Sequence, residues 1–151
     1  MTTAKDPHET QTSALVPTYH LGVYAVVTRG QRVLLVEYKN GLAGLPGALH
    51  TDPNASVEDR LRDTIFEQSG VAVDRFELLG SYAFTNAGGT PQLNLVFLTE
   101  YVSGMVGAAG GRVQKSEWMS LVEVRWHPRA TDLTREAARR AAEILQGPGR
   151  R

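Results

Sequence analysis

Cysteine is absent from the 151 residues of this chain. Its absence excludes disulfide bridges, thiolate zinc sites and a cysteine nucleophile. No apolar run approaches the about twenty residues that a membrane-spanning helix needs, so we expect no membrane partner. The segment Met1–Val16 is polar and lacks the apolar core of a secretory signal. We therefore expect a cytoplasmic protein.

The chain also lacks net charge, because 16 Lys and Arg residues balance 16 Asp and Glu residues. A net charge of zero removes the broad electrostatic attraction to nucleic acid, so we expect no nucleic-acid partner. Any bound anion must be held by local geometry. Hydrophobic residues make up 42% of the chain and charged residues 21%, which is typical of a globular domain. We predict a flexible N-terminal tail over 1–17, a single domain over 18–147 and a C-terminal tail over 148–151.

Hydrophobic patterning predicts strands separated by helices. The predicted strands are Leu21–Val27, Arg32–Tyr38, Phe76–Phe84, Leu93–Val102 and Glu123–Trp126, and the predicted helices are Ser56–Ser69 and Thr134–Gln146. Glycine- and proline-rich loops are expected over 40–53 and 103–111. We expect the first two strands to form a hairpin and Trp126 to be packed in the interior. This order predicts an α+β fold, in which a mixed sheet is covered by helices.

The first predicted helix has clear start and stop signals. Asn54 or Ser56 can cap its N-terminus, and Glu58 and Asp59 lie in its first turn, where negative charge favours the helix dipole. Gly70 follows its last residue and is expected to end it.

The two ends of this helix carry a resemblance to a known family. Leu45-Pro46-Gly47 precedes the helix, which closes on Glu67-Gln68-Ser69-Gly70-Val71. These segments resemble the Nudix hydrolase signature, G-x5-E-x7-R-E-U-x-E-E-x-G-U, in which U is aliphatic. The element order over residues 21–145 also fits that family. The resemblance implies a Nudix-like α/β/α sandwich with a loop–helix–loop that holds Mg²⁺ or Mn²⁺ against a diphosphate.

This chain has other residues at most of the charged positions of the signature. With Gly70-Val71 as the anchor, the motif's arginine falls on Asp63, and its three later glutamates fall on Thr64, Glu67 and Gln68. The motif's early glutamate falls on Ala55, or on Asn54 if the loop is the anchor. Two of the three metal-binding glutamates are therefore replaced. The glutamate–arginine pair that braces the loop in the family is missing as well. The resemblance therefore implies a degenerate Nudix box.

The spacing of Thr64, Glu67 and Gln68 places them on one helix face. Hard divalent cations need several oxygen ligands, preferably charged, and only Glu67 is charged here. We therefore expect Mg²⁺ or Mn²⁺ to bind poorly. Arg60 lies one turn earlier on the same face, where its guanidinium could contact a phosphate in place of the metal. The alternative is an ordinary exposed arginine.

Other acids offer a rearranged metal site. Asp63 lies four residues before Glu67, so the two could bind a metal together; the alternative is a solvated Asp63. Some family members take an extra ligand or general base from a later loop, and Glu117 is the best-placed candidate for that role. Glu67 and Glu117 are thus the predicted catalytic residues. The alternative for Glu117 is an exposed loop acid.

Two aromatic residues predict a nucleotide-binding subsite. Tyr82 and Phe84 alternate on one predicted strand, so they share a face and are candidates for stacking on a nucleobase. With Arg60, Thr64 and Gln68, they complete the predicted substrate-binding residues.

These observations predict a Nudix hydrolase-family protein that binds a nucleoside diphosphate derivative or a similar phosphorylated small molecule. We expect its metal-dependent pyrophosphate hydrolysis to be weakened or lost. One alternative is an active hydrolase that uses Mg²⁺ or Mn²⁺ at a rearranged site built on Glu67, Asp63 and a later glutamate. A second alternative is a structural or protein-binding domain with a vestigial pocket.

Overall fold

One mixed eight-stranded sheet organises the part of the chain that the computed structural model describes, residues 18–107 and 110–147. The predicted tails, 1–17 and 148–151, lie outside these residues. The elements are β1 (His20–Arg29), β2 (Arg32–Tyr38), β3 (Ala43–Gly44), β4 (Gly47–Leu49), α2 (Val57–Ser69), β5 (Val71–Val73), β6 (Glu77–Thr85), β7 (Pro91–Gly104), β8 (Val113–Ser120), α3 (Leu121–Trp126) and α4 (Asp132–Leu145). Within the described ranges, no helix is long and apolar enough to cross a membrane.

Strand β1 lies at the centre of the sheet. It pairs in parallel with β7 along most of its length, from His20 opposite Gln92 to Thr28 opposite Glu100. It also pairs antiparallel with β4 at one end and with β2 at the other. The hairpin between β1 and β2 is confirmed, and Gly30 adopts the positive φ of 60° that its tight turn requires. Parallel and antiparallel pairing together confirm the mixed sheet.

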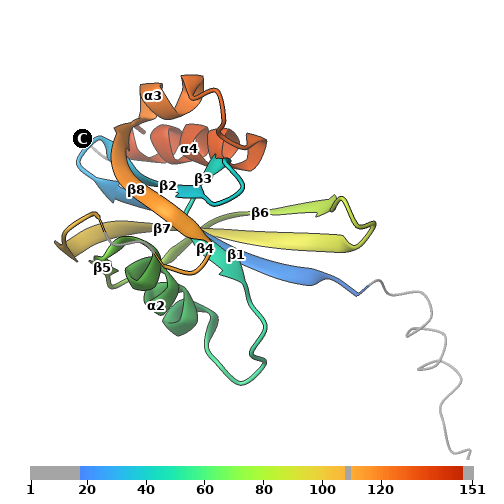
Figure 1. The fold of residues 1–151 in the computed structure, drawn as a ribbon. Helices are drawn as coiled ribbons and strands as arrows, with labels where there is room; N and C mark the ends of the chain where they lie inside the picture. Colours follow the sequence, from blue (N-terminus) through green and yellow to red (C-terminus); the bar gives the residue numbers. More distant parts are fainter. Residues whose placement is uncertain (1–17, 108–109, 148–151) are drawn as a thin grey trace, which may run out of the picture.

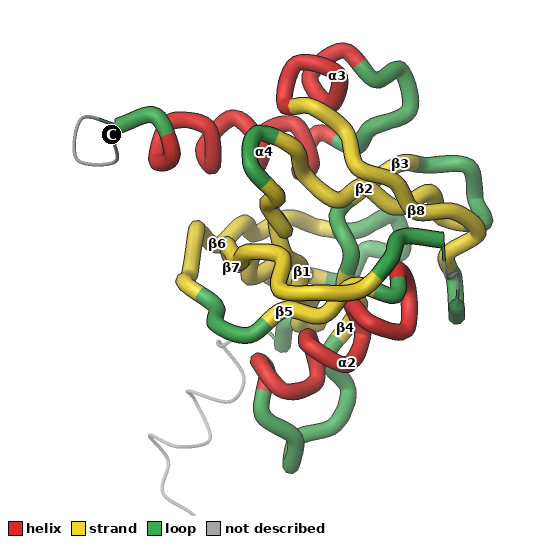
Figure 2. Tube along the Cα trace, turned by 90° about the vertical axis from the view of Figure 1, so that its left-hand side faces the viewer, coloured by secondary structure: helices red, strands yellow, loops and turns green. Residues whose placement is uncertain are grey.

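Helices cover the sheet on opposite sides (Figures 1 and 2). Helix α2 lies on one side, and α3 and α4 lie on the other. Leu61 and Ile65 of α2 belong to one hydrophobic core, whereas Ala137, Ala138 and Ala141 of α4 belong to a second. Two cores separated by a sheet are what a three-layer arrangement requires. The α+β sandwich is therefore confirmed.

Helix α2 begins and ends as its sequence predicts. The hydroxyl of Ser56 accepts a hydrogen bond from the backbone N–H of Asp59, so Ser56 rather than Asn54 is the N-cap. Gly70 has a φ of 84°, and its N–H donates to the carbonyl of Phe66. These caps fix the direction in which α2 presents its side chains.

The C-terminal part of the sheet differs from the prediction. Residues Leu121–Trp126, predicted in part as a strand, form helix α3, because Ser120 and Glu123 cap it reciprocally. Trp126 is 75% exposed, so its predicted interior position is wrong. Strands β5 and β8 were not predicted, and the loop predicted over 40–53 contains the short strands β3 and β4.

Candidate functional site

A cleft of ≈ 1310 Å³ lies where α2, the centre of the sheet and the start of α4 meet. Thr131 and the first turns of α4 form one wall of the cleft, and residues 47–49 of β4 form part of another wall. The residues of α2 that line the cleft are Arg60, Thr64, Glu67 and Gln68, and those of β6 and β7 include Tyr82, Phe84, Gln92 and Asn94. The predicted substrate-binding residues are thus brought together in one cleft.

The buried amide of Gln68 makes two hydrogen bonds with the backbone of Gly47. Its Oε1 accepts a hydrogen bond from the Gly47 N–H, and its Nε2 donates to the Gly47 carbonyl, each at 2.9 Å. Gly47 has a φ of 148°, and a Cβ there would lie 2.2 Å from the carbonyl oxygen of Val23. Only glycine fits this position. Gln68 therefore ties the C-terminal half of α2 to β4, and its amide oxygen, already bonded to the Gly47 N–H, is uncharged.

The remaining groups of the α2 face also have partners. The Arg60 Nη1 lies 3.2 Å from the Glu67 Oε1, with side chains 51% and 60% exposed. The Thr64 hydroxyl donates to the carbonyl of Arg60 at 2.9 Å. The single carboxylate of this face is thus neutralised by the arginine two turns away.

Asp63 and Glu117, predicted as a metal ligand and as a catalytic residue, lie outside the residues that line the cleft. Asp63 is exposed on a different side of α2. Glu117 belongs to β8, where it pairs with Leu35, and its Oε1 lies 3.6 Å from the Nζ of Lys115. Glu117 was predicted in a loop that could reach the site. In the structure it lies in β8, and the register of β8 with β2 fixes its position outside the cleft.

The cation that the resemblance implies, Mg²⁺ or Mn²⁺, does not fit these residues. Nowhere in the described ranges do three or more Asp, Glu or His side chains group as a metal site would require. On the α2 face, Gln68 is occupied by Gly47 and Glu67 is paired with Arg60. Hard divalent cations need more charged oxygens than this face offers.

Two aromatic and two amide side chains form the opposite wall of the cleft. Tyr82 faces Asn94 and Phe84 faces Gln92 in the register of β6 and β7. The Gln92 Nε2 donates to the Asn94 Oδ1 at 2.8 Å, and Phe84 is 46% exposed. The alternation of Tyr82 and Phe84 along β6 predicted this aromatic pair. The sequence did not predict that Gln92 and Asn94 would join it, because the residues opposite each other on β6 and β7 are known only from the register of the two strands.

Two further basic residues line the cleft, from segments that the sequence analysis did not assign to the site. Lys39 follows β2 and Arg112 precedes β8, and both line the cleft with Tyr24 of β1. Burial raises the pKa of Tyr24, and Arg112 acts in the opposite direction. Burial also raises the pKa of Tyr38 well above its ordinary value, and its hydroxyl donates to the Leu45 carbonyl. Both phenols are therefore protonated and uncharged at neutral pH.

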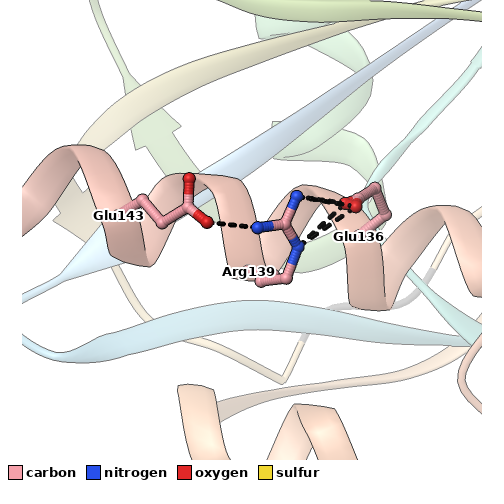
Figure 3. Close-up of polar contacts among 3 residues, drawn as sticks. All are labelled: Glu136, Arg139 and Glu143. Atoms are coloured by element: carbon pink, nitrogen blue, oxygen red, sulfur yellow. Dashed lines mark hydrogen bonds and ion pairs between the residues drawn. The ribbon is translucent and has the colours of Figure 1, made fainter.

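The acids of the α4 wall are paired with arginines of the same helix. Figure 3 shows Arg139 lying between Glu136 and Glu143 on α4 and bonded to both. The hydrogen bond from Arg139 lowers the pKa of Glu136. Asp132 lies 3.5 Å from Arg135. These arginines reduce the repulsion that an anionic ligand would otherwise meet at this wall.

Comparison with known proteins defines the class of this fold. No protein-family model and no curated protein matches the sequence. Among solved structures, the chain is similar to a MutT NUDIX hydrolase from Burkholderia pseudomallei, with 27% identity, a TM-score of 0.71 and coverage of 82% of this chain and 98% of that one. It is also similar to the NUDIX domain of Shewanella oneidensis NrtR complexed with ADP ribose, with 25% identity, a TM-score of 0.73 and coverage of 96% and 99%.

A NUDIX hydrolase from Nitrosomonas europaea gives a TM-score of 0.74 at 22% identity, over 84% of this chain and 90% of that one. The described chain has the Nudix fold. The resemblance to Nudix proteins that the sequence predicted is therefore confirmed at the level of the fold.

Proposed function

We propose that this protein binds a nucleoside diphosphate derivative, or a similar phosphorylated small molecule, and that its metal-dependent hydrolysis is weakened or lost. The α2 face carries this proposal. Its carboxylate, Glu67, is paired with Arg60, and the amide of Gln68 is closed on Gly47. A face built this way offers a divalent cation one carboxylate, which is already paired, and no other charged oxygen.

The rest of the cleft supports a ligand with a flat, polar end. Phe84 and Tyr82 supply rings for stacking, and Gln92 and Asn94 supply amide groups beside them. The Shewanella domain, which is similar to this chain over nearly its whole length, is described with ADP ribose bound. ADP-ribose is therefore the first ligand to test.

The test combines binding with product analysis. The full chain is incubated with ADP-ribose and a panel of nucleoside diphosphate derivatives, with EDTA or with Mg²⁺ or Mn²⁺. We expect one of these ligands to raise the melting temperature in EDTA. We expect no new products by mass spectrometry in any sample, including those with Mg²⁺ or Mn²⁺. Metal-dependent cleavage would instead establish the rearranged hydrolase. Neither stabilisation nor cleavage would favour a structural or protein-binding domain.

A further inference from the structure

Two basic side chains in the cleft make no ion pair within the described part of the chain. Lys39 and Arg112 are exposed, line the cleft and make no ion pair there. They lie side by side because the N–H of Lys39 donates to the carbonyl of Arg112 at 2.8 Å. The pairing of Tyr38 with Val113 fixes this contact as part of the sheet.

All other charged residues that line the cleft are paired. Arg60 holds Glu67, and the acids of the α4 wall, Asp132 and Glu136, are held by Arg135 and Arg139. The lining therefore carries three basic and three acidic residues, but the charges left without an ion pair are both positive. Because the whole chain has no net charge, this local excess is the main electrostatic attraction that the cleft offers to an anion.

Arg112 lies near the α2 end of the cleft. A Cβ on Gly110 would lie 2.7 Å from the carbonyl oxygen of Glu67, so the segment that leads to Arg112 packs against the last turns of α2. Arg112 also lies close enough to Tyr24 to affect its titration, and Tyr24 packs against Gly47. Arg112, Tyr24 and the Gln68–Gly47 pair are thus neighbours in one corner of the cleft.

We propose that Lys39 and Arg112 form the phosphate-binding subsite of this cleft, replacing with fixed positive charge the neutralisation that a divalent cation would supply. The proposal rests on the proposed function, because it places the diphosphate of the ligand at the α2 end. The guanidinium of Arg112 can donate two parallel hydrogen bonds to phosphate oxygens, and the ammonium of Lys39 adds a point charge. The aromatic and amide wall is then left for the nucleoside.

The experiment uses inorganic diphosphate as the probe, with the full chain in EDTA at fixed ionic strength. Isothermal titration calorimetry compares the wild type with Lys39→Ala, Arg112→Ala and the double variant. The control is Arg75→Ala with Lys115→Ala, which removes the same net charge at exposed residues outside the cleft. Arg112→Lys keeps the charge but removes the fork of donors.

Each single variant is expected to weaken diphosphate about tenfold or more, because charge-assisted hydrogen bonds are lost. The control is expected to stay within about twofold of the wild type, since distant exposed charges are screened. Arg112→Lys is expected to fall between wild type and Arg112→Ala. Equal affinity in the wild type and the Lys39→Ala, Arg112→Ala double variant would overturn the proposal, as would an absence of diphosphate binding by the wild type.

A parallel titration with ADP-ribose separates this proposal from the proposed function. If ADP-ribose binds equally well to the wild type and the double variant, the phosphate subsite is wrong and the proposed function stands. If diphosphate binding depends on Lys39 and Arg112 but no nucleoside diphosphate derivative binds, the subsite stands and the proposed function is wrong.

Discussion

Gln68 and Gly47 are joined by two hydrogen bonds of 2.9 Å, in which the side-chain amide pairs with both the N–H and the carbonyl of one residue. A glutamate in place of Gln68 would keep the acceptor but lose the donor. Its second carboxylate oxygen would then face the Gly47 carbonyl in a buried position, with two acceptors opposed and no proton between them.

Gln68→Glu is therefore expected to lower the free energy of unfolding by about 1–3 kcal/mol at neutral pH. Urea denaturation followed by circular dichroism measures it. Glu67→Gln is the matched control, because it exchanges the same two groups at the adjacent exposed residue, and it should change stability by less than about 0.5 kcal/mol. A Gln68→Glu variant as stable as the wild type would show that the amide is not needed at this position.

The Arg60–Glu67 ion pair leads to two opposite expectations for anion binding. Arg60→Ala removes a cation and leaves the Glu67 carboxylate facing the cleft, so inorganic diphosphate should bind about tenfold more weakly. Glu67→Gln releases Arg60 for the ligand and should strengthen binding by about two- to fivefold, the range of an exposed ion pair. Neither variant should change stability much, because both side chains are more than half exposed.

Calorimetric titration of both variants in EDTA decides this point. Weaker binding by Glu67→Gln would mean that the carboxylate itself assists the ligand, and would contradict the expectation. Unchanged binding by both would leave the pair as an ordinary surface contact.

Phe84 is expected to act on the nucleoside part of the ligand only. Phe84→Ala should weaken ADP-ribose by about ten- to a hundredfold, because stacking of a base on an aromatic ring contributes about 1–3 kcal/mol. Its affinity for inorganic diphosphate should not change. Phe66→Ala, which removes an exposed ring outside the cleft, is the control. An equal loss for both ligands would point to a collapsed cleft rather than a lost stacking contact.

The reciprocal cap of α3 gives a prediction about pH. The hydrogen bond from the backbone N–H of Ser120 lowers the pKa of Glu123 in the folded protein, so the folded state binds this proton less tightly than the unfolded chain. The stabilisation is therefore present above the ordinary pKa of a glutamate, 4.5. It is lost as the pH falls through the lower folded value.

Thermal unfolding of the wild type and Glu123→Gln between pH 3 and pH 7 tests this sign. The melting temperature of the wild type should exceed that of Glu123→Gln at neutral pH, and the difference should close in acid. A difference that does not vary with pH would show that ionised Glu123 adds nothing to the cap.

The features of the fold that could be predicted are those that depend on residues close together in the sequence. The caps of α2, its shared face and the alternation of Tyr82 and Phe84 each depend on neighbours within a few residues. Strand β8 was missed because its buried residues, Val113, Ser116 and Met119, recur every three positions across a register shift rather than every two. Its polar sequence therefore gave no alternating pattern.

The partners within the site depended on distances that a sequence does not give. Arg60 reaches Glu67 across two turns of α2, beyond the three- and four-residue spacings that define neighbours on a helix. Lys39 and Arg112 meet only because β2 pairs with β8. The sequence placed Thr64 and Gln68 on the face of α2, but not the partners that they bond, the carbonyl of Arg60 and the backbone of Gly47.

The dependence of ligand affinity on divalent metal tests the central claim most directly. Calorimetric titration of the full chain with ADP-ribose is run in EDTA and in millimolar Mg²⁺, with product analysis of each sample. We predict dissociation constants within about twofold of each other and no cleavage, because fixed positive charge and not a cation neutralises the phosphates. A tenfold or larger gain in affinity with Mg²⁺, or the release of AMP, would contradict it.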